Sequence, residues 1–144
     1  MQTDAQILQL IKTAYPSLTS SERASLGDQV IANTISTDLT QCVPTMIGPG
    51  AVLNALGPAA GAAVMAGIQA AAGTNMSNPL YWGLQVLLAG NLDVSLAATQ
   101  SELQALVSMG TMTQAQMNTL VTLSAVPDSV SVNDVSRVLN ENGY

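Results

Sequence analysis

The chain has 144 residues, a length that suits one ordinary domain with a real hydrophobic core. Hydrophobic residues make up 48% of it, which excludes a largely disordered protein. Only 8% of the residues are charged and the net charge is −6 with three scattered cations, so the chain has no electrostatic footprint for nucleic acid.

Two helix signals open the chain. Asp4 precedes an apolar stripe over residues 7–11, and Pro16 ends this helix because proline disfavours a helical residue before it. Thr19 and Glu22 match a capping box, in which the hydroxyl and the carboxylate each satisfy a free amide of the first turn. The helix that this box opens carries four apolar residues: Leu26, Val30, Ile31 and Ile35.

Proline and glycine punctuate the middle of the chain. Residues 42–50 hold two prolines and two glycines and are expected to form a loop, followed by a short helix over 50–56. A proline at the first helical position predicts a helix over 58–72 that stops at Gly73. The same signal predicts another helix from residue 79 that closes at Gly90.

The last third of the chain has the clearest helix starts. They are expected at a capping box of Thr99 with Glu102, at a second box of Thr113 with Gln116, and at Ser131 as an N-cap. Glycine or proline follows each helix, at Gly110, Pro127 and Gly143. The first two of these helices are separated by a short turn and are expected to form an αα-hairpin.

These patterns predict an all-α fold, a compact bundle of about six short helices with a C-terminal αα-hairpin. We expect one domain over residues 1–144, in three successive parts. They are an N-terminal helix pair (1–38), uncharged central helices (39–92), and the hairpin with a closing helix (93–144). Neither a fixed-period repeat nor an alternating strand pattern of useful length occurs.

Residues 39–92 contain no charged side chain, and this stretch allows three interpretations. The first is a set of central core helices whose wet face is made of Thr, Asn and Gln. The second is a membrane span over 51–72, which has the required length and small residues spaced four apart. Asn54, Pro58 and Gln69 interrupt that run, and neither flank carries Lys or Arg, so a span is disfavoured.

The third interpretation is a protein–protein interface, because interface cores are depleted of charge and small residues let backbones approach closely. Aromatic residues dominate interface hot spots, and Met46, Met65 and Met76 could adapt to a partner. The candidate interface residues are Met46, Ala63, Met65, Gly67, Tyr81 and Trp82. For Trp82 taken alone, the centre of the domain core is the expected position.

Residues for chemistry are scarce. The chain has no His, so the commonest general base and metal ligand is missing. Cys42 is the single cysteine and is expected to be a small buried hydrophobe in a protein made in a reducing cytoplasm. The carboxylates do not cluster, and residues 48–50 lack the Gly-Lys-Ser/Thr that would hold phosphates. We therefore expect no enzyme, no cofactor and no metal. The first residues lack the pattern of a signal peptide.

Five segments together resemble a known group of proteins. A tryptophan-bearing helix at 78–88 leads through 90–94 to a Leu-, Thr- and Gln-rich helical hairpin at 98–107 and 112–123, and a proline-to-valine helix closes the pattern at 127–139. The combination resembles small helical proteins encoded among the virion-structure genes of tailed bacteriophages. Met112 stands where such proteins tend to have Leu, and the centre here is less charged than theirs.

The resemblance implies a context rather than a site. A protein of this kind is expected to be a non-enzymatic structural or assembly component of a tailed-phage virion, made in the host cytoplasm. Its expected partners are other virion proteins or further copies of itself, as a homo-oligomer, with no nucleic acid and no membrane. The alternative is a soluble phage-encoded regulator or inhibitor that binds one host protein.

Overall fold

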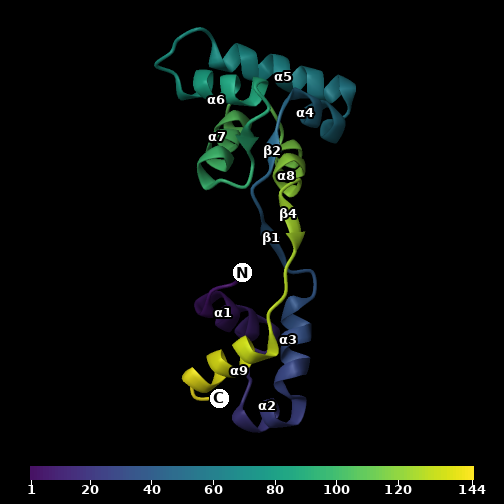
Figure 1. The fold of residues 1–144 in the computed structure, drawn as a ribbon, viewed down its shortest axis with the longest axis vertical. Coiled ribbons are helices and arrows are strands. Elements are labelled where there is room, and N and C mark those ends of the chain that lie inside the picture. Colours follow the sequence, from purple (N-terminus) through teal and green to yellow (C-terminus); the bar gives the residue numbers. More distant parts are fainter. The chain divides into compact units, whose positions relative to one another are not determined.

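The computed structural model describes residues 1–144 and is mostly helical, with 63% of residues in helices and 7% in strands (Figure 1). The all-α prediction is thus confirmed in its general form. The helices are α1 (Asp4–Ala14), α2 (Ser20–Leu26), α3 (Asp28–Ser36), α4 (Pro49–Leu56), α5 (Pro58–Ala72), α6 (Pro79–Leu88), α7 (Ala97–Ser108), α8 (Gln114–Thr122) and α9 (Val132–Glu141). The strands are β1 (Thr40–Cys42), β2 (Met46–Ile47), β3 (Leu92–Asp93) and β4 (Ala125–Pro127).

The nine helices exceed the expected total of about six. The individual helix signals mark eight of them, and a break at Gly27 accounts for the ninth. The sequence predicts one helix from the Thr19 capping box through Ile35. Gly27 instead adopts φ 82°, a left-handed conformation that only glycine takes without strain, and it separates α2 from α3. The same residue ends one helix and caps the next.

Capping boxes define three helix starts. The boxes of Thr19 with Glu22 and Thr113 with Gln116 are confirmed, and a third, in which Thr3 caps α1, escaped the sequence analysis. The box predicted for Thr99 is wrong. Helix α7 begins earlier, at Ala97, so Thr99 is its third residue and is buried.

The chain divides into two compact units, which we call unit 1 (Met1–Gln41 with Val126–Tyr144) and unit 2 (Cys42–Ala125). Unit 1 is therefore built from both ends of the chain, and unit 2 is inserted between them. The expected C-terminal part, 93–144, is shared between the two units, because α9 packs with α1 and α3 rather than with the hairpin before it. In the segments that connect the units, β1 pairs with β4.

Unit 1 has its own hydrophobic core. Helix α9 is strongly amphipathic, and its apolar side chains Val135, Val138 and Leu139 are completely buried. They pack with residues of α1 and α3 and with the segment before α9: Ile7, Ile11, Ile31, Ala32, Ile35 and Val130.

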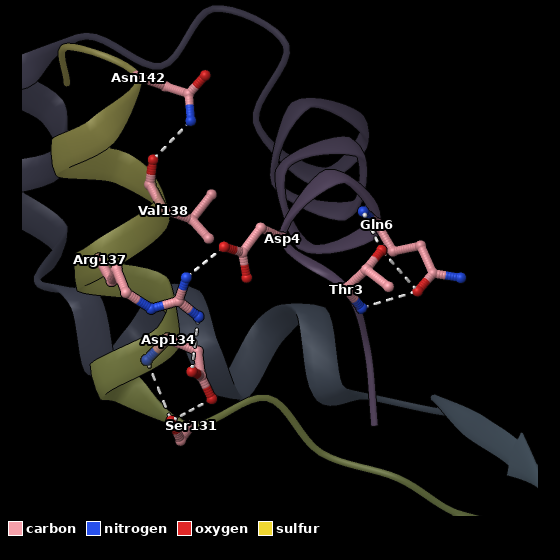
Figure 2. A network of polar contacts seen from close by, with 8 residues as sticks. All are labelled: Thr3, Asp4, Gln6, Ser131, Asp134, Arg137, Val138 and Asn142. Atoms are coloured by element: carbon pink, nitrogen blue, oxygen red, sulfur yellow. Dashed lines mark hydrogen bonds and ion pairs between the residues drawn. The ribbon is translucent and has the colours of Figure 1, made fainter.

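Ion pairs connect the helices of unit 1. Arg137 on α9 donates hydrogen bonds to Asp4 at the start of α1 and to Asp134 (Figure 2). Ser131 caps α9 by accepting a hydrogen bond from the Asp134 amide, and its hydroxyl donates to the Asp134 carboxylate. Arg23 on α2 makes a two-pronged contact with Asp28, with both N···O distances 2.7 Å. The same guanidinium donates to the backbone carbonyl of Tyr144 and to the Asn140 side chain, so it fixes α2 against the C-terminal segment.

These contacts make unit 1 sensitive to acid. Hydrogen bonds from Arg23 and Ser136 hold the pKa of Asp28 below its usual 3.8 despite its partial burial, with the Arg23 bond the largest cause. The Arg137 hydrogen bond lowers the pKa of Asp4 in the same way, and hydrogen bonds from Ser131 and Arg137 lower that of Asp134. A carboxylate with a lowered folded-state pKa stabilises the fold above its unfolded pKa, and this contribution is lost as pH falls through the folded value.

We therefore expect the urea midpoint of unit 1 to fall between about pH 5 and pH 3, where these carboxylates gain protons. Asp28→Asn should lower the midpoint at pH 7 and flatten its dependence on pH, because one of the titrating groups is gone. Urea unfolding followed by hydrogen exchange at pH 7, 4 and 3 measures both effects. An Asp28→Asn protein with the pH dependence of the wild type would contradict this assignment.

Unit 2 has a second, separate core around α4 to α8. The expected αα-hairpin is present, with Leu103 and Leu106 of α7 and Met117 and Leu120 of α8 in one buried cluster. The rest of this cluster comes from all parts of the unit: Ile47, Val52, Val64, Ile68, Ala72, Leu84, Leu87, Leu92, Val94 and Met112.

Asp93 stabilises a short strand pair in unit 2. β2 and β3 are antiparallel, with Met46 opposite Asp93. One carboxylate oxygen of Asp93 accepts hydrogen bonds from the Thr45 amide and from the amide and hydroxyl of Ser95, at 2.7–3.0 Å. The Ser95 hydroxyl is the largest cause of a lowered Asp93 pKa, followed by the two amides. This buried acid is therefore structural.

Glycine also permits close packing between α4 and α5. A Cβ on Gly61 would lie 2.8 Å from the Leu53 Cα and 3.1 Å from the Val52 carbonyl oxygen, and backbone atoms cannot yield cheaply. A Cβ on Gly50 of α4 would meet nothing within 4 Å. The two glycines therefore differ in what an added methyl group would do.

We expect Gly61→Ala to destabilise unit 2 by about 1–3 kcal/mol, because overpacking outweighs the better helix propensity of alanine. Gly50→Ala is the matched control and should stabilise the unit by up to about 1 kcal/mol. Urea denaturation of the two variants measures both changes. Equal changes in the free energy of unfolding for the two variants would show that the space between α4 and α5 accommodates a methyl group at residue 61.

Candidate interaction surface of unit 2

Unit 2 presents almost no charge. Its residues include only two ionisable acids, Asp93 and Glu102, and all three cations of the chain belong to unit 1. Asp93 is buried and hydrogen-bonded, so Glu102 is the only acid that unit 2 can offer to a partner. A protein surface normally carries charges of both signs at a quarter or more of its positions. The exposed faces of unit 2 consist of small, polar and apolar side chains instead.

Helix α6 is apolar on both of its faces. Leu84 and Leu87 are buried in the core of unit 2, and Leu80 packs against it. On other sides of the helix Trp82, Val86 and Leu88 are exposed, and Met76 is exposed in the loop before the helix. We call Trp82, Val86 and Met76 the α6 surface. Leu88 lies on a different side of the helix, with the exposed Gln85 between it and Trp82. Large apolar side chains exposed next to one another give the α6 surface the composition of a covered face.

The structure places Trp82 on the surface, where 54% of it is exposed, and the expectation of a buried core tryptophan is wrong. The reason is the helical spacing: Leu80, Leu84 and Leu87 form the inward stripe, and Trp82 lies outside it. The indole is nevertheless held in place. Its Nε1 donates a 2.8 Å hydrogen bond to the Met76 carbonyl oxygen, and the Tyr81 ring packs edge-on at a centroid distance of 5.1 Å.

This arrangement prepares the tryptophan for contact with a protein. Because the Nε1–H is already satisfied within the chain, the exposed part of the ring needs no polar partner. The hydrogen bond and the Tyr81 contact restrict the side chain before any partner arrives, which lowers the entropy lost on binding.

The other sequence candidates are scattered over β2, α5 and α6. Met46 is exposed on β2 and Ala63 is exposed on α5. Met65 is half-buried and packs against the core of unit 2. Gly67 faces Thr111, whose side-chain methyl lies 2.8 Å from where a Cβ would stand. The structure brings Tyr81 and Trp82 together on α6, and Ala63 and Gly67 are neighbours on one face of α5.

Sequence reasoning missed Val86, although its signal was present, because it follows Trp82 by four residues and thus shares its face of α6. Met76 was among the methionines expected to adapt to a partner. Its position beside Trp82 could not be predicted, since it depends on the turn that carries the Met76 carbonyl oxygen to the indole.

Glu102 adjoins the α6 surface from the neighbouring helix. Its Oε2 lies 2.9 Å from the position that a Cβ on Gly83 would occupy, so the carboxylate rests against the backbone of α6. It forms neither a hydrogen bond nor an ion pair within the chain. Beneath it lies a hollow of about 30 Å³ lined mainly by leucines, with Thr99 and Glu102 as its polar members.

Other features of the chain offer little chemistry. Cys42, expected to be buried, is exposed at the end of β1. A surface hollow of about 460 Å³ in unit 1 has Glu22 as its one charged lining residue, and that carboxylate is engaged in the α2 cap. No group of three or more Cys, Asp or Glu side chains is placed to hold a metal ion. None of the helices combines the length and the apolar character needed to cross a membrane.

Comparisons of the chain with protein-family models, with curated proteins and with solved structures give no match.

Proposed function

We propose that the chain is a non-enzymatic structural or assembly protein that acts by packing unit 2 against other proteins. The observation that carries the proposal is the α6 surface, in which a pre-positioned tryptophan lies exposed beside Val86 and is hydrogen-bonded to the exposed Met76. It occurs on a unit that has one accessible charge. Large exposed apolar patches on a folded protein mark sites that another molecule covers.

The electrostatics of unit 2 support a protein partner. Interface cores are depleted of charged residues, because each charge must be stripped of water before it is buried. Unit 2 meets this condition over most of its surface, whereas unit 1 carries all of the cations and most of the acids. The two units thus suit different tasks: an interacting unit 2 and a more polar unit 1.

We further propose that the setting is the virion of a tailed bacteriophage, with assembly in the host cytoplasm. The support is the resemblance over residues 78–139, whose tryptophan-bearing helix is α6 and whose hairpin is α7 with α8. In that setting the α6 surface is covered by neighbouring virion proteins or by other copies of the chain.

Quantitative mass spectrometry of purified particles from the phage that encodes this chain tests the proposal. A structural component is expected at a fixed copy number, and crosslinking in the same particles should join residues of α6 to a neighbouring protein. A chain made in infected cells but absent from particles would contradict the virion role and favour the alternative, a regulator that binds one host protein.

A further inference from the structure

Building on the proposed function, we infer that the partner of the α6 surface is a segment of a different protein that carries a lysine or arginine next to apolar side chains. The cation is received by Glu102 where its carboxylate rests against Gly83. The apolar neighbours of that cation pack on Trp82 and Val86.

The two parts of this site adjoin on one turn of α6. Val86 follows Trp82 by four residues and Gly83 by three, so it lies next to both on the helix surface. The Glu102 carboxylate therefore borders the α6 surface at its edge toward α7. A cation beside an apolar residue on a partner matches this spacing.

No role within the chain explains Glu102. It lies beyond the first turn of α7, so it does not cap the helix and is too far from the helix N-terminus to interact favourably with the helix dipole. Unit 2 contains no cation that could pair with it. Gly83 makes the position possible at a cost, because glycine inside a helix is less stable than alanine. Glu102 is half-buried beside leucines, in a space that the missing side chain of Gly83 leaves open. A positive charge from the partner protein would explain why an acid is kept at this position.

Charge also selects the class of partner. A lone carboxylate repels phosphate groups, so lipid headgroups and nucleic acids do not fit this site. A second copy of the chain fits poorly, because Arg23 and Arg137 are engaged in ion pairs and Lys12 is the one cation without a partner. The large apolar neighbours of Lys12, Leu8 and Tyr15, are partly buried and already pack against the core of unit 1, and its exposed neighbours Gln9 and Thr13 are polar. A different protein remains the occupant that matches both the charge and the apolar surface.

Two peptides test the inference directly. Acetyl-Leu-Arg-Leu-amide and its neutral counterpart acetyl-Leu-Gln-Leu-amide are titrated into the isotopically labelled full chain, followed by NMR. We expect the arginine peptide to shift the Trp82 indole and the Gly83 and Glu102 amides, and to bind about 2–5-fold more tightly than the glutamine peptide, as expected for a partly exposed ion pair.

Two variants locate the effect. Glu102→Gln should abolish the preference for arginine while leaving the fold unchanged. Gly83→Ala should do the same without removing the charge, because its Cβ would displace the carboxylate tip, and the alanine should stabilise α6. Equal binding of the two peptides to the wild type, or an arginine preference that survives both substitutions, would overturn the inference.

The proposed function has a separate point of failure. If Glu102→Gln leaves incorporation into particles unchanged while substitutions at Trp82 prevent it, the cation site is wrong and the packing role stands. If Lys12→Gln and Glu102→Gln weaken self-association of the chain equally, the occupant is a second copy and a different protein is excluded. If substitutions at Trp82 do not affect incorporation, the packing role itself is wrong.

Discussion

Leu139→Ala is expected to unfold unit 1 and leave unit 2 folded. Leu139 is completely buried on α9, where it packs with residues of α1 and α3 in a core of only nine buried residues. Removing a buried leucine side chain costs about 2–5 kcal/mol, which is comparable to the whole stability of a small unit. Unit 2 has its own core and does not contain this residue.

Hydrogen exchange resolved along the chain measures this result. Amides of α1, α3 and α9 should exchange rapidly in Leu139→Ala, and amides of α5 and α8 should keep their protection. Leu139→Met, which nearly conserves volume, is the control and should cost less than about 1.5 kcal/mol. Loss of protection in both units at once would contradict the presence of two separate cores.

Trp82→Ala is expected to leave the fold intact and to remove most of the affinity for the partner. Because 54% of Trp82 is exposed, its truncation should change the free energy of unfolding much less than the 3–5 kcal/mol of a core tryptophan. A pre-positioned tryptophan at the centre of an interface typically contributes 2–4 kcal/mol, so the dissociation constant should rise by about 30- to 1000-fold.

Urea denaturation and the affinity for the partner identified by crosslinking give the two quantities. Leu123→Ala serves as the control. Leu123 is also an exposed apolar residue of unit 2, but it lies at the end of α8 and is not part of α6. A large loss of stability in Trp82→Ala would show that Trp82 is part of the core. An unchanged affinity would show that it does not contribute to the interface.

Local signals in the sequence predict most of the helices. The pairs Thr19–Glu22 and Thr113–Gln116 cap their helices as expected, and Pro58 and Pro79 begin theirs, because these effects act within one turn. The Thr99 box fails because α7 begins two residues earlier, at Ala97, so Thr99 lies inside the helix, and Glu102 packs over Gly83 of α6.

Which helices pack together in each unit could not be predicted from the sequence. Helix α9 packs against α1, more than a hundred residues away, through an amphipathic face that would have suited many partners. Trp82 was named among the interface candidates and, taken alone, was assigned to the core. The core assignment is wrong, because a helix with apolar residues on opposite sides does not reveal which side is buried.

The most direct test of the packing role is to place a charge on the α6 surface and follow the chain into particles. Val86→Glu adds a carboxylate to an exposed residue next to Trp82, and Val30→Glu adds one to an equally exposed valine on α3 of unit 1. Both proteins should fold, because neither side chain belongs to a core. The measurement is the ratio of each variant to the wild type in particles assembled from a mixture. We predict that Val86→Glu is depleted by about tenfold or more, as expected for a charge left unpaired in an interface core, while Val30→Glu is incorporated like the wild type. Equal incorporation of the two variants would contradict the claim that unit 2 acts through its α6 surface.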